Sequence, residues 1–147
     1  MLNTEMNVSL LSKDDKISKK TKETIESLSH CFIVNSHNSR DFLEHQKYKS
    51  LPVFQIFLFD LDNCCDSVKE FLDELHRKNF LNVVTAAFSR KENPEKMDEF
   101  FINGGNIFFV FPKKQCGVKD ILFKLMKVSY KIKTSPVNRE FLIFKLN

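Results

Sequence analysis

The chain of 147 residues has no tryptophan, three glycines, four prolines and four cysteines. This composition excludes a collagen-like chain and a disulfide-stapled miniprotein. No apolar run approaches the roughly 20 residues that a membrane-spanning helix requires, which excludes a membrane protein. What the chain does contain is a 42% share of hydrophobic residues, with sixteen phenylalanines among them. This share predicts a single domain with an aromatic-rich core.

The cysteines and histidines do not form a metal-binding pattern. Cys31, Cys64, Cys65 and Cys116 contain no C-x-x-C motif, and none has a histidine at zinc-ligand spacing. We interpret them as reduced thiols of a cytosolic protein. The first eight residues lack the basic and apolar regions of a signal peptide, so we expect a cytoplasmic location without a membrane partner.

Short apolar runs alternate along the chain with segments of helical periodicity. The alternation predicts an α/β fold, a flavodoxin-like five-stranded parallel sheet in the order 2-1-3-4-5 with helices on both faces. We expect a domain over residues 7–130 and a C-terminal extension over 131–147, in which 141–146 reads as an extra strand or as the stump of a linker. The predicted strands are 8–11, 31–34, 53–59, 83–88 and 107–111, and the predicted helices are 17–28, 39–43, 66–75, 94–101 and 118–125.

Asp60 directly follows the most apolar run of the sequence, Val53 to Phe59. A carboxylate at the end of a buried strand costs burial energy and adds no packing, so its presence indicates chemistry. In a parallel α/β sheet the carboxyl ends of the strands form the ligand site. A cap of the following loop or helix is the alternative interpretation.

The layout of most of the chain resembles the CheY-like receiver domain of bacterial two-component response regulators. The resemblance implies that Asp60 is the phosphoacceptor. It also implies that Ser89 and Phe108 are a switch pair, in which Ser89 reads the phosphoryl group. Gly104 and Pro112 match a glycine and a proline of the family.

The sequence departs from the family's pattern at the lysine that contacts the phosphoryl group. Phe111 stands at this position, so one positive charge is missing. Phosphoryl transfer to a carboxylate brings negative charges together, and Mg²⁺ and the lysine normally offset them. The departure therefore predicts weak or absent phosphorylation.

A second departure lies at the acidic pair that holds Mg²⁺ after the first strand. The register that best fits the following helix places Ser12 and Lys13 there, and Lys13 could then pair with Asp60 without a metal ion. A slip of two residues would instead bring Asp14 and Asp15 to Asp60 as Mg²⁺ ligands. The first register predicts no cofactor, and the second predicts weakly bound Mg²⁺.

These departures predict an atypical, non-enzymatic receiver-like module of a two-component or phosphorelay pathway that acts by protein–protein interaction. The expected partner is a sensor kinase, an output protein or a second copy of the chain. In the family, the usual contact surface combines the fourth helix, the fifth strand and the fifth helix, and here it would include Phe108 and residues 113–117. The run 141–146 is a second candidate contact, through pairing at a strand edge.

A haloacid-dehalogenase-like phosphatase is the alternative. The string FDLDN resembles that family's first motif, with Asp60 as nucleophile and Asp62 as acid–base. Thr85 or Ser89 could supply the second motif and Lys113 the lysine. The acidic motif that completes the magnesium site has no candidate, and that family carries its first motif on the first strand.

Direct binding of nucleic acid is not expected. Twenty-three Lys and Arg against 19 Asp and Glu give a mild net charge of +4. Acidic residues interleave with the lysines, and there is no helix-turn-helix, zinc or aromatic RNA-binding signature. The lysines cluster in two segments, with Lys13, Lys16, Lys19, Lys20 and Lys22 in the first and Lys124, Lys127, Lys131 and Lys133 in the second.

Overall fold

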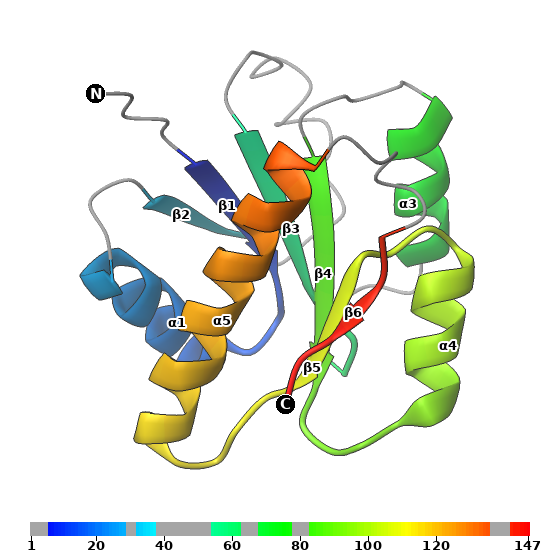
Figure 1. Ribbon diagram of the computed structural model, residues 1–147. Coiled ribbons are helices and arrows are strands. Elements are labelled where there is room, and N and C mark those ends of the chain that lie inside the picture. The colour runs from blue at the N-terminus through cyan, green and yellow to red at the C-terminus, as the bar shows by residue number, and fades with distance from the viewer. Residues whose placement is uncertain (1–5, 29–31, 38–53, 63–67, 78–82, 136–141) are drawn as a thin grey trace.

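The computed structural model describes residues 6–28, 32–37, 54–62, 68–77, 83–135 and 142–147 (Figure 1). Strands and helices alternate, as predicted, and the helix predicted over 39–43 lies outside the described residues. The strands are β1 (Met6–Leu11), β2 (Phe32–His37), β3 (Phe54–Asp60), β4 (Val83–Ser89), β5 (Ile107–Val110) and β6 (Phe144–Lys145). The helices are α1 (Asp15–Leu28), α3 (Val68–Arg77), α4 (Pro94–Ile102) and α5 (Gln115–Thr134).

The strands form one parallel sheet in the order β2-β1-β3-β4-β5-β6. The first five strands therefore have the predicted order 2-1-3-4-5, and a sixth strand joins the sheet from the C-terminal extension. The extra strand β6 lies along β5 of its own chain and forms the edge of the sheet, so part of the run 141–146 is the extra strand that the sequence offered as one interpretation. The helix α5 continues to Thr134, past the predicted domain boundary at 130.

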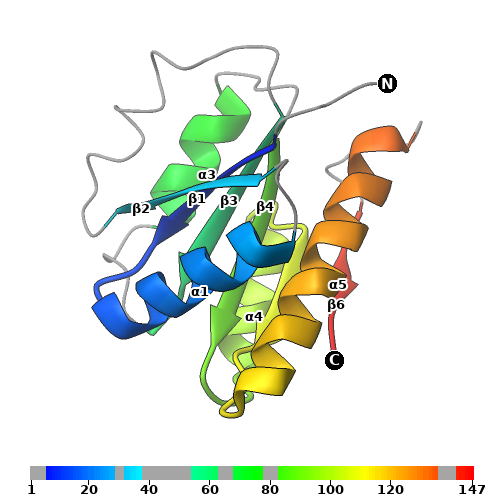
Figure 2. The ribbon, with the colours of Figure 1, turned by 90° about the vertical axis from the view of Figure 1, so that its left-hand side faces the viewer.

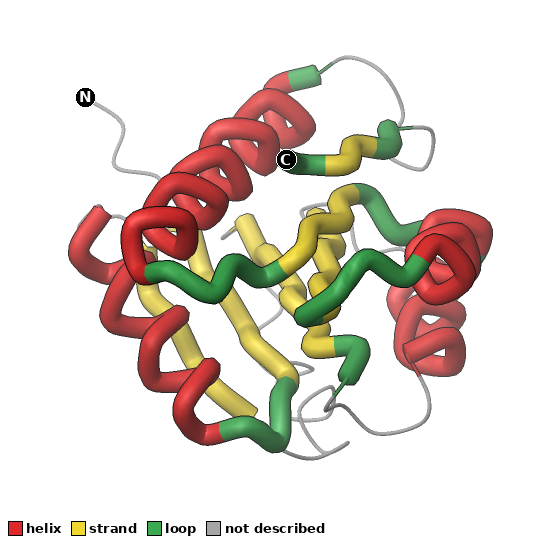
Figure 3. Tube along the Cα trace, turned by 90° about the horizontal axis from the view of Figure 1, so that it is seen from below, coloured by secondary structure: helices red, strands yellow, loops and turns green. Residues whose placement is uncertain are grey.

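Helices cover both faces of the sheet, with α1 and α5 on one face and α3 and α4 on the other (Figures 2 and 3). Alternate residues of β3 enter the two resulting cores, because successive side chains of a strand point to opposite faces. Ile56 and Leu58 join the core under α1 and α5, whereas Phe57 and Phe59 join the core under α3 and α4. All seven residues of β3 are buried, as expected for a central parallel strand.

The core under α3 and α4 is built from phenylalanine rings in edge-to-face contact. The ring of Phe71 lies 5.5 Å from that of Phe57 and 5.1 Å from that of Phe59, and Phe100 lies 6.2 Å from Phe59. Such pairs add to the free energy gained by burying the rings. The prediction of an aromatic-rich core is confirmed.

The helix α4 begins and ends where the sequence signals predict. The side chain of Asn93 accepts a hydrogen bond from the Lys96 amide at 3.1 Å, and Pro94 occupies the first turn. After α4, Gly104 has a φ of +102°, a conformation that favours glycine. A Cβ atom there would also collide with the ring of His76 from α3. Over the described ranges, no helix combines the length and apolarity needed to cross a bilayer.

Candidate functional site

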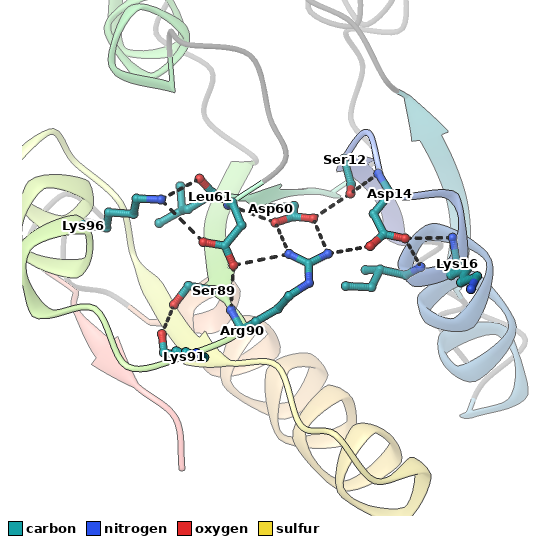
Figure 4. Close-up of polar contacts among 11 residues, drawn as sticks. Ser12, Asp14, Lys16, Asp60, Leu61, Ser89, Arg90, Lys91 and Lys96 are labelled. Carbon is teal, nitrogen blue, oxygen red and sulfur yellow. Dashed lines mark hydrogen bonds and ion pairs between the residues drawn. The ribbon is translucent and has the colours of Figure 1, made fainter.

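Asp60 ends β3 and is fully buried although it carries a carboxyl group. Strand β1 lies beside β3 with Leu11 paired to Phe59. The residues that follow this pair, Ser12 and Asp60, therefore lie next to each other. The Ser12 hydroxyl donates to Asp60 Oδ2 at 2.7 Å, and the Asp62 amide donates to Asp60 Oδ1 at 3.0 Å (Figure 4). Both carboxylate oxygens are therefore hydrogen-bonded from within the chain.

Ser12 follows β1 directly and is buried, which is the register that the helix pattern favoured. Lys13 is exposed in this register. The predicted pairing of Lys13 with Asp60 was therefore wrong, since the charged group that meets Asp60 comes from another strand.

That charged group is the guanidinium of Arg90, directly after β4. Asp60 pairs with Phe88 in the β3–β4 register, which brings the end of β4 next to it. Nη1 of Arg90 lies 3.3 Å from Asp60 Oδ1 and Nη2 lies 3.4 Å from Asp60 Oδ2. Nη2 also contacts Asp14 Oδ2 at 2.7 Å, and Nη1 contacts Asp62 Oδ2 at 3.3 Å. One guanidinium thus bridges three carboxylates. We call Arg90, Asp14, Asp60 and Asp62 together the Arg90 cluster.

Asp62 makes further contacts with the Arg90 backbone and with Lys96. The Arg90 amide donates to Asp62 Oδ2 at 2.8 Å. The ammonium of Lys96, in the first turns of α4, lies 3.5 Å from Asp62 Oδ1 and donates to the Leu61 carbonyl at 3.2 Å. Backbone and side-chain donors therefore hold Asp62 in place on both of its oxygens.

Asp14 has a structural role as well as an ionic one. Its Oδ1 accepts hydrogen bonds from the amides of Lys16 at 3.0 Å and Ile17 at 3.2 Å, which caps the start of α1. Its Oδ2 faces Arg90. Asp15, the other predicted magnesium ligand, is exposed in the first turn of α1.

The network changes the acidity of its members. The pKa of Asp14 is lowered, first by the Ile17 amide and further by Arg90, against the opposing effect of burial. Burial raises the pKa of Asp62, but the hydrogen bonds and charges of Arg90 and Lys96 outweigh it, so the net shift is downward. Burial lowers the pKa of Arg90, and the surrounding carboxylates outweigh it and raise it. Asp14, Asp62 and Arg90 therefore stay charged across the physiological range.

The described residues do not fit Mg²⁺ as they are arranged. Among them, no three acidic, histidine or cysteine side chains lie where they could hold a metal ion together. The oxygens of Asp14, Asp60 and Asp62 that face one another share a guanidinium, which occupies the place where a cation would neutralise them. The predicted set of Asp14, Asp15 and Asp60 is not brought together, since Asp15 is exposed.

The remaining receiver-like positions lie at or near the same edge. Ser89 is buried at the end of β4, and its hydroxyl donates to the Lys91 carbonyl at 2.6 Å. In the β4–β5 register Ser89 pairs with Val110, and Phe108 pairs with Ala87. Phe108 is buried in the core under α3 and α4.

Phe111 occupies the predicted lysine position as part of the other core. Its ring lies 5.1 Å from that of Phe88 and packs under α1 and α5. Its amide donates to the Ser89 carbonyl at 2.8 Å. The position thus supplies packing at the edge of the sheet and no positive charge.

Of the residues that the phosphatase alternative requires, Asp62 and Ser89 lie at the same sheet edge as Asp60, whereas Thr85 and Lys113 do not. Thr85 lies nearer the start of β4, where its amide donates to Asn106 Oδ1 at 3.1 Å. Lys113 is exposed between β5 and α5. Asp120, an acid that stands alone in the sequence and so cannot supply that family's acidic motif, is 67% exposed on α5 beside Lys124.

An open cleft of about 640 Å³ adjoins the Arg90 cluster. It gives solvent access to one side of the cluster, although Asp60 itself stays buried. The cleft is lined by Asp14, Asp62, Arg90, Lys91, Glu92 and Asn93.

Arg90 and Lys96 are two residues of the candidate site that the sequence analysis did not identify. Arg90 carried a usable signal, because it follows Ser89 at the end of a strand whose carboxyl end meets that of β3. Lys96 carried no such signal, since its proximity to Asp62 depends on where α4 packs.

Comparisons with known proteins establish the fold. No protein-family model and no curated protein matches the sequence, whereas 31 chains of known structure match. CheY4, a chemotaxis response regulator of Vibrio cholerae, has a TM-score of 0.65 at 16% identity, covering 85% of this chain and 99% of its own. An orphan response regulator of H. pylori has a TM-score of 0.65 at 13% identity, over 84% and 96% of the two chains.

A third match is the isolated receiver domain of RcsB from Salmonella enterica serovar Typhimurium, solved with the phosphomimetic BeF₃⁻. Its TM-score is 0.63 at 14% identity, over 84% of this chain and 89% of that one. The predicted CheY-like receiver fold is confirmed. At such low identities, the comparisons establish the fold alone.

Proposed function

We propose that this chain is an atypical receiver-like signalling module that acts by binding a protein partner, with Asp60 held unphosphorylated by Arg90. The observation that carries the proposal is the guanidinium that bridges Asp14, Asp60 and Asp62. It supplies within the chain the positive charge that a metal ion supplies in phosphoryl transfer to a carboxylate.

Arginine replaces a metal ion electrostatically but not chemically. A metal ion accepts phosphoryl oxygens as ligands and so aligns the phosphodonor with the nucleophile. The N–H groups of Arg90 that face the site are already engaged by three carboxylates, and a guanidinium keeps its charge at any physiological pH. A phosphodonor would have to displace these ion pairs.

The surroundings of Asp60 oppose phosphorylation in two further ways. Its carboxylate is fully buried and accepts a hydrogen bond from Ser12 at 2.7 Å. Phe111 provides an aromatic ring where a lysine would stabilise the developing charge. These features support a module that keeps one conformation until a partner binds.

The experiment is a backbone NMR titration with millimolar Mg²⁺ followed by beryllofluoride. For the wild-type chain we expect no shifts at the amides of Asp60, Asp62 and Ser89, and no phosphorylation by a small phosphodonor. In Arg90→Gln the three carboxylates lose their shared cation, so we expect Mg²⁺-dependent shifts at the same amides. Arg77→Gln, which breaks a surface pair with Glu74, is the matched control and should behave as wild type.

Stable, Mg²⁺-dependent phosphorylation of wild-type Asp60 would overturn the proposal. Asp60→Asn identifies the modified residue, because the variant lacks the nucleophilic carboxylate. The partner class is tested separately with the unmodified chain. We expect wild type to bind a sensor kinase or an output protein, or to form a dimer in light scattering, without added phosphodonor.

A further inference from the structure

The C-terminal strand β6 is tied to the edge of β5 by backbone hydrogen bonds. The amide of Phe144 donates to the Asn106 carbonyl at 2.7 Å, and the amide of Leu146 donates to the Phe108 carbonyl at 2.9 Å. The side chains of Leu142, Phe144 and Leu146 are partly buried against the core under α1 and α5. Figure 1 shows β6, in red, running beside β5 at the end of the sheet.

A buried asparagine connects this strand to the interior. Asn106 Oδ1 accepts from the Thr85 amide at 3.1 Å, and its Nδ2 donates to the Leu142 carbonyl at 3.0 Å. Both halves of the amide group are used, so its orientation is determined by the network. Release of β6 would leave the buried Nδ2 without the Leu142 carbonyl as acceptor.

The same strand contacts the segment that carries Arg90. The ammonium of Lys145 lies 3.4 Å from the carboxylate of Glu92, two residues after Arg90. The start of this segment is also bound to the sheet, since the Ser89 carbonyl accepts from the Phe111 amide at 2.8 Å. Residues 90–93 therefore contact the Arg90 cluster on one side and β6 on the other.

We propose that β6 is a latch whose docking on β5 is coupled to the Arg90 cluster through residues 90–93. When the cluster rearranges, the segment shifts, the contact between Glu92 and Lys145 weakens, and β6 detaches from the edge of β5 more often. The uncovered edge then offers unpaired backbone groups next to Asn106 and Phe108. The inference rests on the proposed function only in treating the Arg90 cluster as the site at which a signal arrives. The coupling between the cluster and β6 is a separate property.

Coupling between two sites is reciprocal, so a protein that strips β6 from β5 would also loosen the cluster. The strength of this coupling is limited by the ion pair between Lys145 and Glu92 that transmits it. The Lys145–Glu92 pair is exposed, with side chains 39% and 66% accessible. Pairs of this kind change an equilibrium by a factor of at most about five.

The test is amide hydrogen exchange of Phe144 and Leu146 in the full chain, followed by NMR. Arg90→Gln should reduce their protection about threefold to fivefold, because the segment at Glu92 loses its anchor. The matched control Arg77→Gln should leave it unchanged. The Ile56 amide in the central strand reports global unfolding. The loss of protection at Phe144 and Leu146 must therefore exceed any loss of protection at Ile56.

Two further variants separate the link from general loosening of the C-terminus. Lys145→Gln cuts the contact with Glu92, whereas Lys124→Gln removes only the contact between Lys124 and the Asn147 carbonyl. The effect of Arg90→Gln should disappear in the Lys145→Gln background and persist in the Lys124→Gln background. If Arg90→Gln does not fold, Lys145→Gln alone should speed exchange of the Arg90 amide, which donates to Asp62.

Equal protection of Phe144 and Leu146 in Arg90→Gln and Arg77→Gln would overturn the latch. So would an Arg90→Gln effect that survives in the Lys145→Gln background. Both results leave the proposed function standing, because that proposal fails only if wild-type Asp60 is phosphorylated.

Discussion

Phe59 and Asp60 are neighbours at the end of β3, both completely buried, and they are held in opposite ways. Phe59 packs between the rings of Phe71 and Phe100. Asp60 makes no such packing contribution and is stabilised by directed donors, chiefly Ser12 and the guanidinium of Arg90. The comparison shows that apolar packing stabilises the sheet, whereas hydrogen bonds and ion pairs stabilise the charged site at its edge.

Apolar burial tolerates changes of partner, whereas a buried charge does not. A ring gains free energy from any neighbours that exclude water. A carboxylate in the same place needs donors at hydrogen-bond distance, and removing one leaves its charge incompletely compensated. The three predictions below break or sharpen this contrast, in order of decreasing effect.

The largest effect is expected from Phe59→Ala, which removes a buried ring from the core under α3 and α4. The free energy of unfolding should fall by about 3–5 kcal/mol, because a cavity remains between Phe71 and Phe100. Urea unfolding followed by circular dichroism measures it. Phe123→Ala is the control, since that ring is 48% exposed on α5 and the loss, including its cation–π contact with Lys127, should cost about 1 kcal/mol or less. Equal losses in the two variants would contradict the assignment of Phe59 to the core.

An intermediate effect is expected from Ser12→Ala at the edge. The hydroxyl donates to a buried carboxylate, and hydrogen bonds to charged groups contribute about 1.5–3 kcal/mol. The same unfolding experiment measures the loss. Ser27→Ala removes a hydroxyl that donates to the neutral Thr24 carbonyl at 2.7 Å, and it should cost only about 0.5–1.5 kcal/mol. A smaller loss in Ser12→Ala than in Ser27→Ala would show that Asp60 does not depend on Ser12.

The smallest effect is expected from acid. Asp14 and Asp62 have pKa values below their ordinary value of 3.8 in the folded chain. Such groups stabilise the fold above the unfolded pKa, and this contribution is lost as the pH falls through the lowered, folded pKa. Wild-type stability should therefore decline mainly below pH 3.8, as followed by urea unfolding at a series of acidic pH values.

Arg90→Gln sharpens the acid prediction. Without the guanidinium and its charge, the pKa of Asp62 should lie closer to its ordinary value, so the decline below pH 3.8 should be smaller and confined to a narrower pH range. Asp14 should change less, because the Ile17 amide remains as the leading cause of its lowered pKa. Arg77→Gln serves as the control and should keep the wild-type profile. Identical profiles in the two variants would count against the ionic role of Arg90.

Much of the fold could be predicted because it follows from local patterns. The uniform apolar run before Asp60 predicts a central strand, and Asn93 with Pro94 predicts the start of α4. Neither inference requires knowledge of a distant residue. The run near the C-terminus was recognised as a strand, but its pairing with β5 was left open, because a two-residue strand carries no signal for its neighbour.

The candidate site was predictable only in part. The location of Asp60 at the edge of the sheet could be predicted because it directly follows a buried strand. The helical register of α1 predicted that Ser12 directly follows the first strand. The identity of the cation could not be predicted, because an ion pair between Asp60 and Arg90 joins residues 30 positions apart. Lys13, next to Ser12 in sequence, was the local candidate and is exposed instead.

The sequence by itself therefore determined the alternation of strands and helices, the aromatic core and the buried carboxylate at the end of β3. Only the tertiary structure decided that Arg90 and Lys96 compensate the carboxylates, and that β6 lies on β5 beside the segment carrying Arg90. The physical reason is range. Hydrophobic periodicity and capping act within a few residues, whereas ion pairs and strand neighbours depend on which distant segments the folded sheet brings together.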